Sequence, residues 1–226
     1  MKFNLFAVLL ALSISFSVNA QFGGLGGLVG GAKGGGGDAG AQIDSFNADA
    51  QLISTAVGFA LLQIQAALGS KESGAAALKV AEEHAKATTP GEKDAIMGRQ
   101  IKESGAATVE LLKAADAKAK MESLSEDMKK KVAQSILAVA VAGLKAPAMI
   151  NKGKNIIQSV GTNPMMITKL GSVKDGITLL ADALPKLAPI VTTGMQLMRD
   201  VKVDPGTPTE SSKLEANPKI TMPDDS

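Results

Sequence analysis

The chain has 226 residues, of which 45% are hydrophobic, 3% aromatic and 20% charged, and its formal net charge is +2. This length suffices for one domain, or two, with a buried core, and the near balance of acidic and basic residues gives no field that would attract nucleic acid. The absence of cysteine excludes disulfides, zinc–thiolate sites and iron–sulfur clusters.

Residues 1–20 have the layout of a cleavable secretory signal. Lys2 is followed by an apolar stretch from Leu5 to Val18, and small residues precede the expected cut after Ala20. The stretch is shorter than the roughly 20 residues of a membrane-spanning helix, and no second spanning segment is expected further along. We therefore expect an exported chain, and because it has no disulfides the periplasm of a Gram-negative bacterium is the expected compartment. An uncleaved N-terminal anchor is the alternative.

The segment 21–41 is rich in glycine, with 11 of the chain's 24 glycines. Glycine at this density favours a flexible tether, because ordering it costs much backbone entropy. Leu25, Leu28 and Val29 lie among glycines spaced four apart, which leaves a second hypothesis, peripheral association with a membrane. The segment lacks the Gly-Lys-Ser/Thr ending of a phosphate-binding loop.

Residues 42–203 are predicted to form a helical domain. The first helix has apolar side chains at alternating spacings of three and four, which places them on one side: Ile43, Phe46, Ala50, Ile53, Val57, Ala60, Ile64 and Leu68. Ser70 is the expected N-cap of a second helix over 71–87, and Thr89 caps a third that starts at Pro90.

A fourth helix is predicted to start at a capping box formed by Ser123 and Glu126 and to run through Leu144. Pro147 should break or kink it, because proline removes a backbone donor and clashes one turn back. A short helix through Ile156 and Ile157 is expected to follow.

The most regular apolar pattern runs from Met166 to Val201, and Pro185 and Pro189 predict a kink or break in its middle. Together these elements indicate an all-α fold, an antiparallel bundle of about five to six helices. Since the last pattern is typical of a coiled-coil seam, we interpret it as the face for a protein partner or for self-association: Met166, Leu170, Val173, Ile177, Leu180, Leu184, Leu187, Val191 and Met198.

A hexapeptide occurs twice, as Lys71–Ala76 and again as Lys102–Ala107. The repeat indicates either a local duplication inside an ordinary bundle or a short array of helical repeats, although arrays usually need three or more copies. Beyond the helical domain, residues 204–226 are rich in Pro, Ser, Thr and acids without apolar periodicity, and we expect a disordered tail.

No catalytic residue, metal ligand or cofactor-binding residue stands out, so we expect no enzyme and no cofactor. His84 is the sole histidine and has no second ligand at helical spacing, so it is interpreted as an exposed residue without a special role. Met165, Met166, Met195 and Met198 could offer thioethers to Cu(I), but methionine is a common gap filler in cores, and we favour packing.

These observations predict an exported, non-catalytic binding or scaffolding component of the cell envelope that acts through an apolar helix face. The alternative is a carrier of an apolar ligand, such as a lipid, held between the helices, because proline kinks and methionines can open apolar cavities in a bundle. The identity of any partner or ligand stays open.

Overall fold

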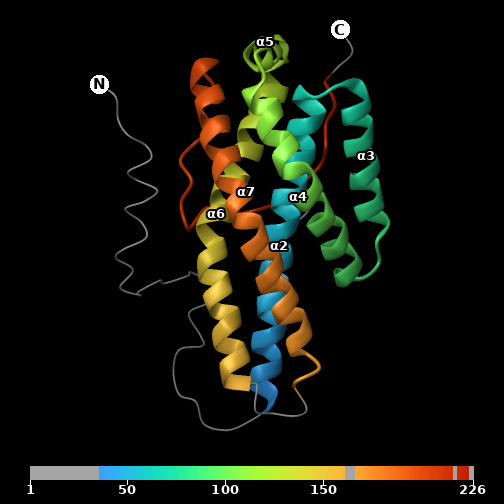
Figure 1. The fold of residues 1–226 in the computed structure, drawn as a ribbon, viewed down its shortest axis with the longest axis vertical. Helices are drawn as coiled ribbons and strands as arrows, with labels where there is room; N and C mark the ends of the chain where they lie inside the picture. The colour runs from blue at the N-terminus through green and yellow to red at the C-terminus, as the bar shows by residue number, and fades with distance from the viewer. Residues whose placement is uncertain (1–35, 161–165, 216–217, 224–226) are drawn as a thin grey trace, which may run out of the picture. The chain divides into compact units, whose positions relative to one another are not determined.

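The computed structural model describes residues 36–160, 166–215 and 218–223. The predicted signal and most of the glycine-rich segment lie outside these ranges. Six α-helices form within them (Figure 1): α2 (Gly36–Leu68), α3 (Lys71–Lys86), α4 (Pro90–Lys113), α5 (Ala117–Ser123), α6 (Glu126–Val160) and α7 (Leu170–Asp200). The described residues include no strand. The predicted all-α bundle is confirmed.

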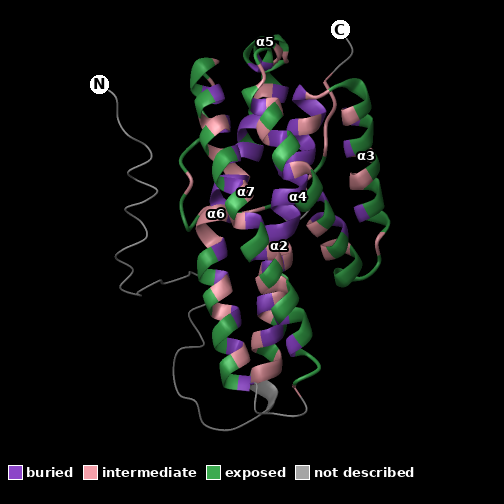
Figure 2. Ribbon diagram, viewed as in Figure 1, coloured by how far each residue is buried: buried purple, intermediate pink, exposed green. Residues whose placement is uncertain are grey.

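Helix α2 is the central element, because it contacts every other helix. All eight positions of its predicted stripe are buried, and so are Phe59 and Leu62 on the flank beside it. Figure 2 shows that the buried residues gather where the helices face one another, whereas α3 is exposed along much of its length. Over residues 53–68 α2 is covered on several sides and lacks the exposed polar face of an ordinary surface helix, whereas its first half keeps exposed polar residues such as Asp44.

Two helices, α2 and α6, are long and apolar enough to cross a membrane by length and composition alone, so the expectation of no second such segment is wrong. The apolar window of α2 is 83% buried within the bundle, as in the core helix of a folded domain. The window of α6 is 50% buried.

The helix ends follow local capping chemistry. Ser70 and Thr89 cap α3 and α4 as predicted: Ser70 accepts a hydrogen bond from the Ser73 amide, and Thr89 accepts one from the Glu92 amide. Glu92 in turn accepts from the Thr89 amide and completes a capping box that was not predicted from the sequence. At the start of α6 the predicted cap is wrong by two residues: the hydroxyl of Ser125 accepts from the Met128 amide at 3.4 Å, whereas Ser123 donates to Lys120 in the preceding turn.

The prolines do not break their helices. α6 continues through Pro147, and α7 continues through Pro185 and Pro189. All three are exposed, so the carbonyls that lose their amide partner one turn back lie on the solvent side. The predicted breaks are therefore absent, and one helix spans the region assigned to two.

Close helix approach in this bundle depends on glycine. The ring of Phe46 lies between α6 and α7, where a Cβ at Gly153 would come 2.7 Å from ring atom Cε2 and one at Gly176 would come 3.0 Å from Cε1. Because real carbon contacts lie near 3.5–4.0 Å, only glycine lets these backbones close on the ring.

The two hexapeptide copies occupy different places in their helices. The first begins α3 at Lys71, and the second lies within α4. Each copy places a buried glycine at a close contact, Gly74 against Met222 and Gly105 against Lys186. The different positions favour a local duplication over an array of equivalent repeats.

The described part of the tail has no helix or strand, yet it packs on the bundle. Leu214 lies against the main core, and Ile220 and Met222 lie against a smaller one. The Lys145 ammonium donates to the carbonyl of Glu210 at 2.6 Å. These contacts correct the expectation of disorder for these residues, because side chains and backbone groups hold the segment without any periodic pattern.

Candidate functional site

The predicted partner face of α7 is turned into the bundle. Five of its nine residues are buried: Leu170, Val173, Leu180, Leu187 and Met198. The other four, Met166, Ile177, Leu184 and Val191, are half-buried and pack against the main core. The stripe therefore packs within the chain on its neighbours α2, α4 and α6, and only its half-buried side is within reach of a partner.

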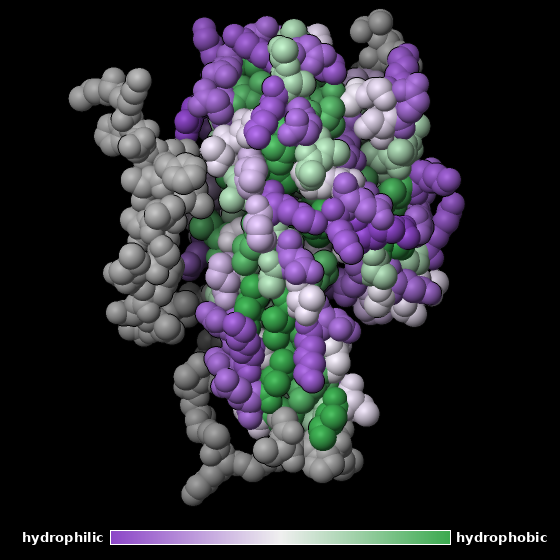
Figure 3. Space-filling model, viewed as in Figure 1, coloured by the Kyte–Doolittle hydropathy of each residue, from purple (hydrophilic) through white to green (hydrophobic). Residues whose placement is uncertain are grey.

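We call the half-buried residues Met166, Ile177, Leu184 and Val191, together with Ile167, the α7 margin. Ile167 is 55% exposed, and among the described residues it is the one large hydrophobic residue that is exposed rather than buried or half-buried. Figure 3 shows a strip of hydrophobic side chains between α6 and α7 in the lower half of the bundle, bordered by hydrophilic residues on either side. An apolar strip with a polar border is the composition of a protein-binding surface.

His84 is buried, which corrects the interpretation that it is an exposed residue. Its side chain is 6% exposed, and its ring meets Phe59 edge to face at 5.2 Å between centroids. Nε2 has no hydrogen-bond partner in the described structure. Burial lowers the pKa of His84 below its usual value, and the charge of Lys93 adds to the shift. The ring therefore packs in the core in its neutral form. The two glutamates that precede it in the sequence are typical of an exposed helix face, so the sequence did not indicate this burial.

Polar side chains are also buried between α2 and α4. The amide of Gln100 donates to Oε1 of Gln65 at 3.2 Å and to the hydroxyl of Ser104 at 2.7 Å, and Gln65 donates to Thr108 at 3.5 Å. Such a network satisfies buried groups and fixes the register of the two helices. It contains no charged group that could act as an acid or base.

One carboxylate has a raised pKa. Burial raises the pKa of Asp94, and a hydrogen bond from Ser54 at 3.2 Å opposes the shift. A perturbed carboxylate can mark an active site, but the contact between Asp94 and Ser54 joins α4 to α2 and acts as a structural link between the two helices. The hydroxyl of Ser54 also lies 3.0 Å from the carbonyl oxygen of Gln51 in its own helix, so its single proton is shared between the two acceptors. The described contacts supply no second titratable group at this position.

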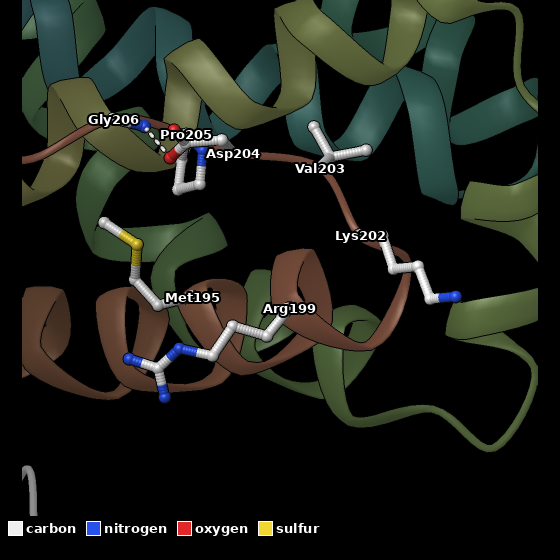
Figure 4. A pocket seen from close by; sticks show the side chains of 7 residues that line it. All are labelled: Met195, Arg199, Lys202, Val203, Asp204, Pro205 and Gly206. Carbon is white, nitrogen blue, oxygen red and sulfur yellow. Dashed lines mark hydrogen bonds between the residues drawn. The ribbon is translucent and has the colours of Figure 1, made fainter.

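Two hollows are open at the surface. One, of about 370 Å³, lies between the end of α7 and the segment after it and is lined by Met195, Arg199 and residues 202–206. Figure 4 shows that the charged ends of Arg199 and Lys202 lie on opposite sides of the hollow rather than converging, and that Asp204 accepts from the Gly206 amide. The other, of about 490 Å³, is lined by Gln65, Ser70 and Ser73 from one side and residues of α4 from the other. Neither hollow brings together side chains that could act as a catalytic acid, base or nucleophile.

The described residues contain no group of three or more side chains of the metal-binding types close enough to hold an ion. No family model matches the sequence. No curated protein and no solved structure shows significant similarity to it. The described residues form an all-α helical bundle.

Proposed function

We propose that the chain is an exported, non-catalytic binding or scaffolding component of the cell envelope, and that it associates with a second copy of itself through the α7 margin. The observation that carries the proposal is the exposure of Ile167 next to half-buried Met166 at the start of α7. The predicted signal at residues 1–20 supports export.

The α7 margin suits self-association because Ile177, Leu184 and Val191 belong to a helix with the spacing of a coiled-coil seam, while Met166 and Ile167 lie in the turn that precedes this helix. The buried side of the stripe packs inside one chain and the other side is left at the surface, so a second copy can extend the same packing outward. Ile177 and Leu184 contribute partly covered apolar area, which association would bury further.

Sedimentation velocity of residues 21–226 tests this proposal over about 1–200 μM, the range of weak interfaces. We expect a concentration-dependent dimer that Ile167→Asp shifts to monomer, because the change places a charge on the exposed apolar residue. Ala85→Asp on α3 is the matched control, since Ala85 is exposed on a helix that does not pack on α7. A wild-type chain that stays monomeric over the whole range contradicts the proposal.

A further inference from the structure

The last described stretch of the chain, residues 218–223, packs against side chains from three helices. Gln63 of α2 and Lys131 of α6 both bond to Thr221, and Gly74 of α3 contacts Met222. The three walls come from sequence positions far apart, and they meet at one extended segment. We call this place the tail groove.

The central contact joins the side chain of Gln63 to the backbone of Thr221. The side-chain amide of Gln63 donates to the carbonyl oxygen of Thr221 at 2.9 Å and accepts from its amide nitrogen at 2.9 Å. A glutamine amide has the donor and acceptor of a peptide unit, so this pair reproduces the pairing of two neighbouring strands. With the tail in place Gln63 is 4% exposed, so both of its polar atoms are bonded to the tail and shielded from water.

The residues on either side of Thr221 supply the apolar contacts. Ile220 and Met222 pack against the smaller core cluster, which includes Phe59, Leu62 and Ala77. Gly74 makes room for the end of the Met222 side chain, since a Cβ at that position would collide with the methyl group. The hydroxyl of Thr221 bonds to the ammonium of Lys131. The groove therefore selects an apolar residue before and after a central residue that it holds by the backbone.

We propose that the tail groove is a binding site for an extended peptide segment of another protein, with apolar side chains flanking one backbone-paired residue, and that the chain's own C-terminal segment occupies it until displaced. Capture of an extended segment through its backbone, with pockets for alternate side chains, is a general mode of peptide recognition. The site lies apart from the α7 margin, so it does not depend on the proposed self-association.

The connection that brings the segment to the groove allows exchange. The residues after α7 that the structure describes, 201–215 and 218–223, have no helix or strand, and half-buried side chains such as Val203 and Leu214 pack them against the bundle. A segment tethered by an irregular connection has an effective concentration of about 1 mM at its binding site. A foreign peptide therefore competes when it binds the site more tightly than the tail does, or when the contacts of the tail are weakened. The resident segment thus sets a threshold for partner binding.

The experiment uses the isotope-labelled chain of residues 21–226 and an unlabelled synthetic peptide with the sequence of residues 217–226. Peptide at concentrations of about 1 mM and above should displace the tail and move the Thr221 amide resonance of the chain toward its solvent-exposed position. The control peptide carries Ile220→Asp and Met222→Asp and should leave this resonance unchanged.

The same peptide should bind more tightly to a chain with Met222→Asp, whose own tail is weakened. A peptide N-methylated at Thr221 lacks the backbone donor but keeps every side chain, and we expect it to bind about tenfold more weakly or worse. Displacement from the wild-type chain or binding to the variant supports the proposal. It is overturned if neither occurs while the wild-type chain is folded, or if N-methylation leaves binding unchanged. Should the variant fail to fold, the wild-type titration decides alone.

Discussion

Two glycines of α6 give a matched test of how the bundle is packed. A Cβ at Gly153 would lie 2.7 Å from Phe46 Cε2 and 2.8 Å from two atoms of Ile177, whereas a Cβ at Gly143 meets nothing within 4 Å. Glycine-to-alanine substitution gains about 1 kcal/mol of helix propensity at either position. At Gly153 the ring and the isoleucine must also move by about 0.7 Å to restore normal contacts, an overpacking that costs about 1–3 kcal/mol.

We therefore expect Gly143→Ala to raise the free energy of unfolding by up to about 1 kcal/mol, and Gly153→Ala to leave it unchanged or lower it by up to about 2 kcal/mol. The difference between the variants isolates the overpacking, because the propensity gain cancels. With a urea m-value of about 2 kcal/mol/M, a difference of 2 kcal/mol separates the midpoints by about 1 M. The assay is urea unfolding followed by circular dichroism, since the chain has no tryptophan or tyrosine. Equal stabilisation by both variants would refute the close approach at Phe46.

Three further predictions concern single residues. Pro147→Ala should raise the free energy of unfolding by about 1–3 kcal/mol, because α6 already passes through this exposed position and alanine restores a backbone donor to the helix. Thermal unfolding measures the change, and a lower unfolding midpoint in the variant would contradict a continuous helix at this position. Thr89→Ala removes the capping box of α4 and should cost about 1 kcal/mol in urea unfolding, whereas an unchanged midpoint would show that the cap contributes nothing. The pKa of His84 is lowered in the folded state, so as the pH falls below about 6.5 the histidine is protonated in the unfolded chain before it is protonated in the folded chain. The free energy of unfolding should therefore decrease toward pH 5 and become constant once the pH lies below the folded-state pKa. His84→Leu should flatten this decline between about pH 7.5 and 5, and a decline that stays as steep in the variant would assign the effect to other groups.

The sequence predicts most of the core because apolar spacing determines which side of a helix is buried. In α2 all eight stripe residues are buried as expected. In α7 the same kind of pattern was interpreted as a partner face, but periodicity does not say what covers a face, and the covering helices belong to the same chain. Of the nine residues in the pattern, only the half-buried Met166, Ile177, Leu184 and Val191 are partly at the surface.

Other features depend on contacts that leave no local pattern. His84 is buried because Phe59 of another helix lies against it, and its own neighbours are charged. The tail groove depends on the Gln63 side chain pairing with a backbone unit 158 residues away. Ser123 and Ser125 both offer a hydroxyl before α6, and only the backbone course of α5 decides which one caps. The presence of a proline does not tell which side of a helix it faces, and Pro147 lies on the solvent side, where the helix continues through it.

The central claim, that this bundle binds protein rather than an apolar small molecule, is tested most directly by native mass spectrometry of the chain purified gently from its own cells. We expect the masses of the mature chain alone and of its dimer, with the dimer lost in Ile167→Asp and retained in Ala85→Asp. A single chain that carries a bound acyl or polycyclic species, with no dimer, would contradict it and favour a carrier of apolar ligands.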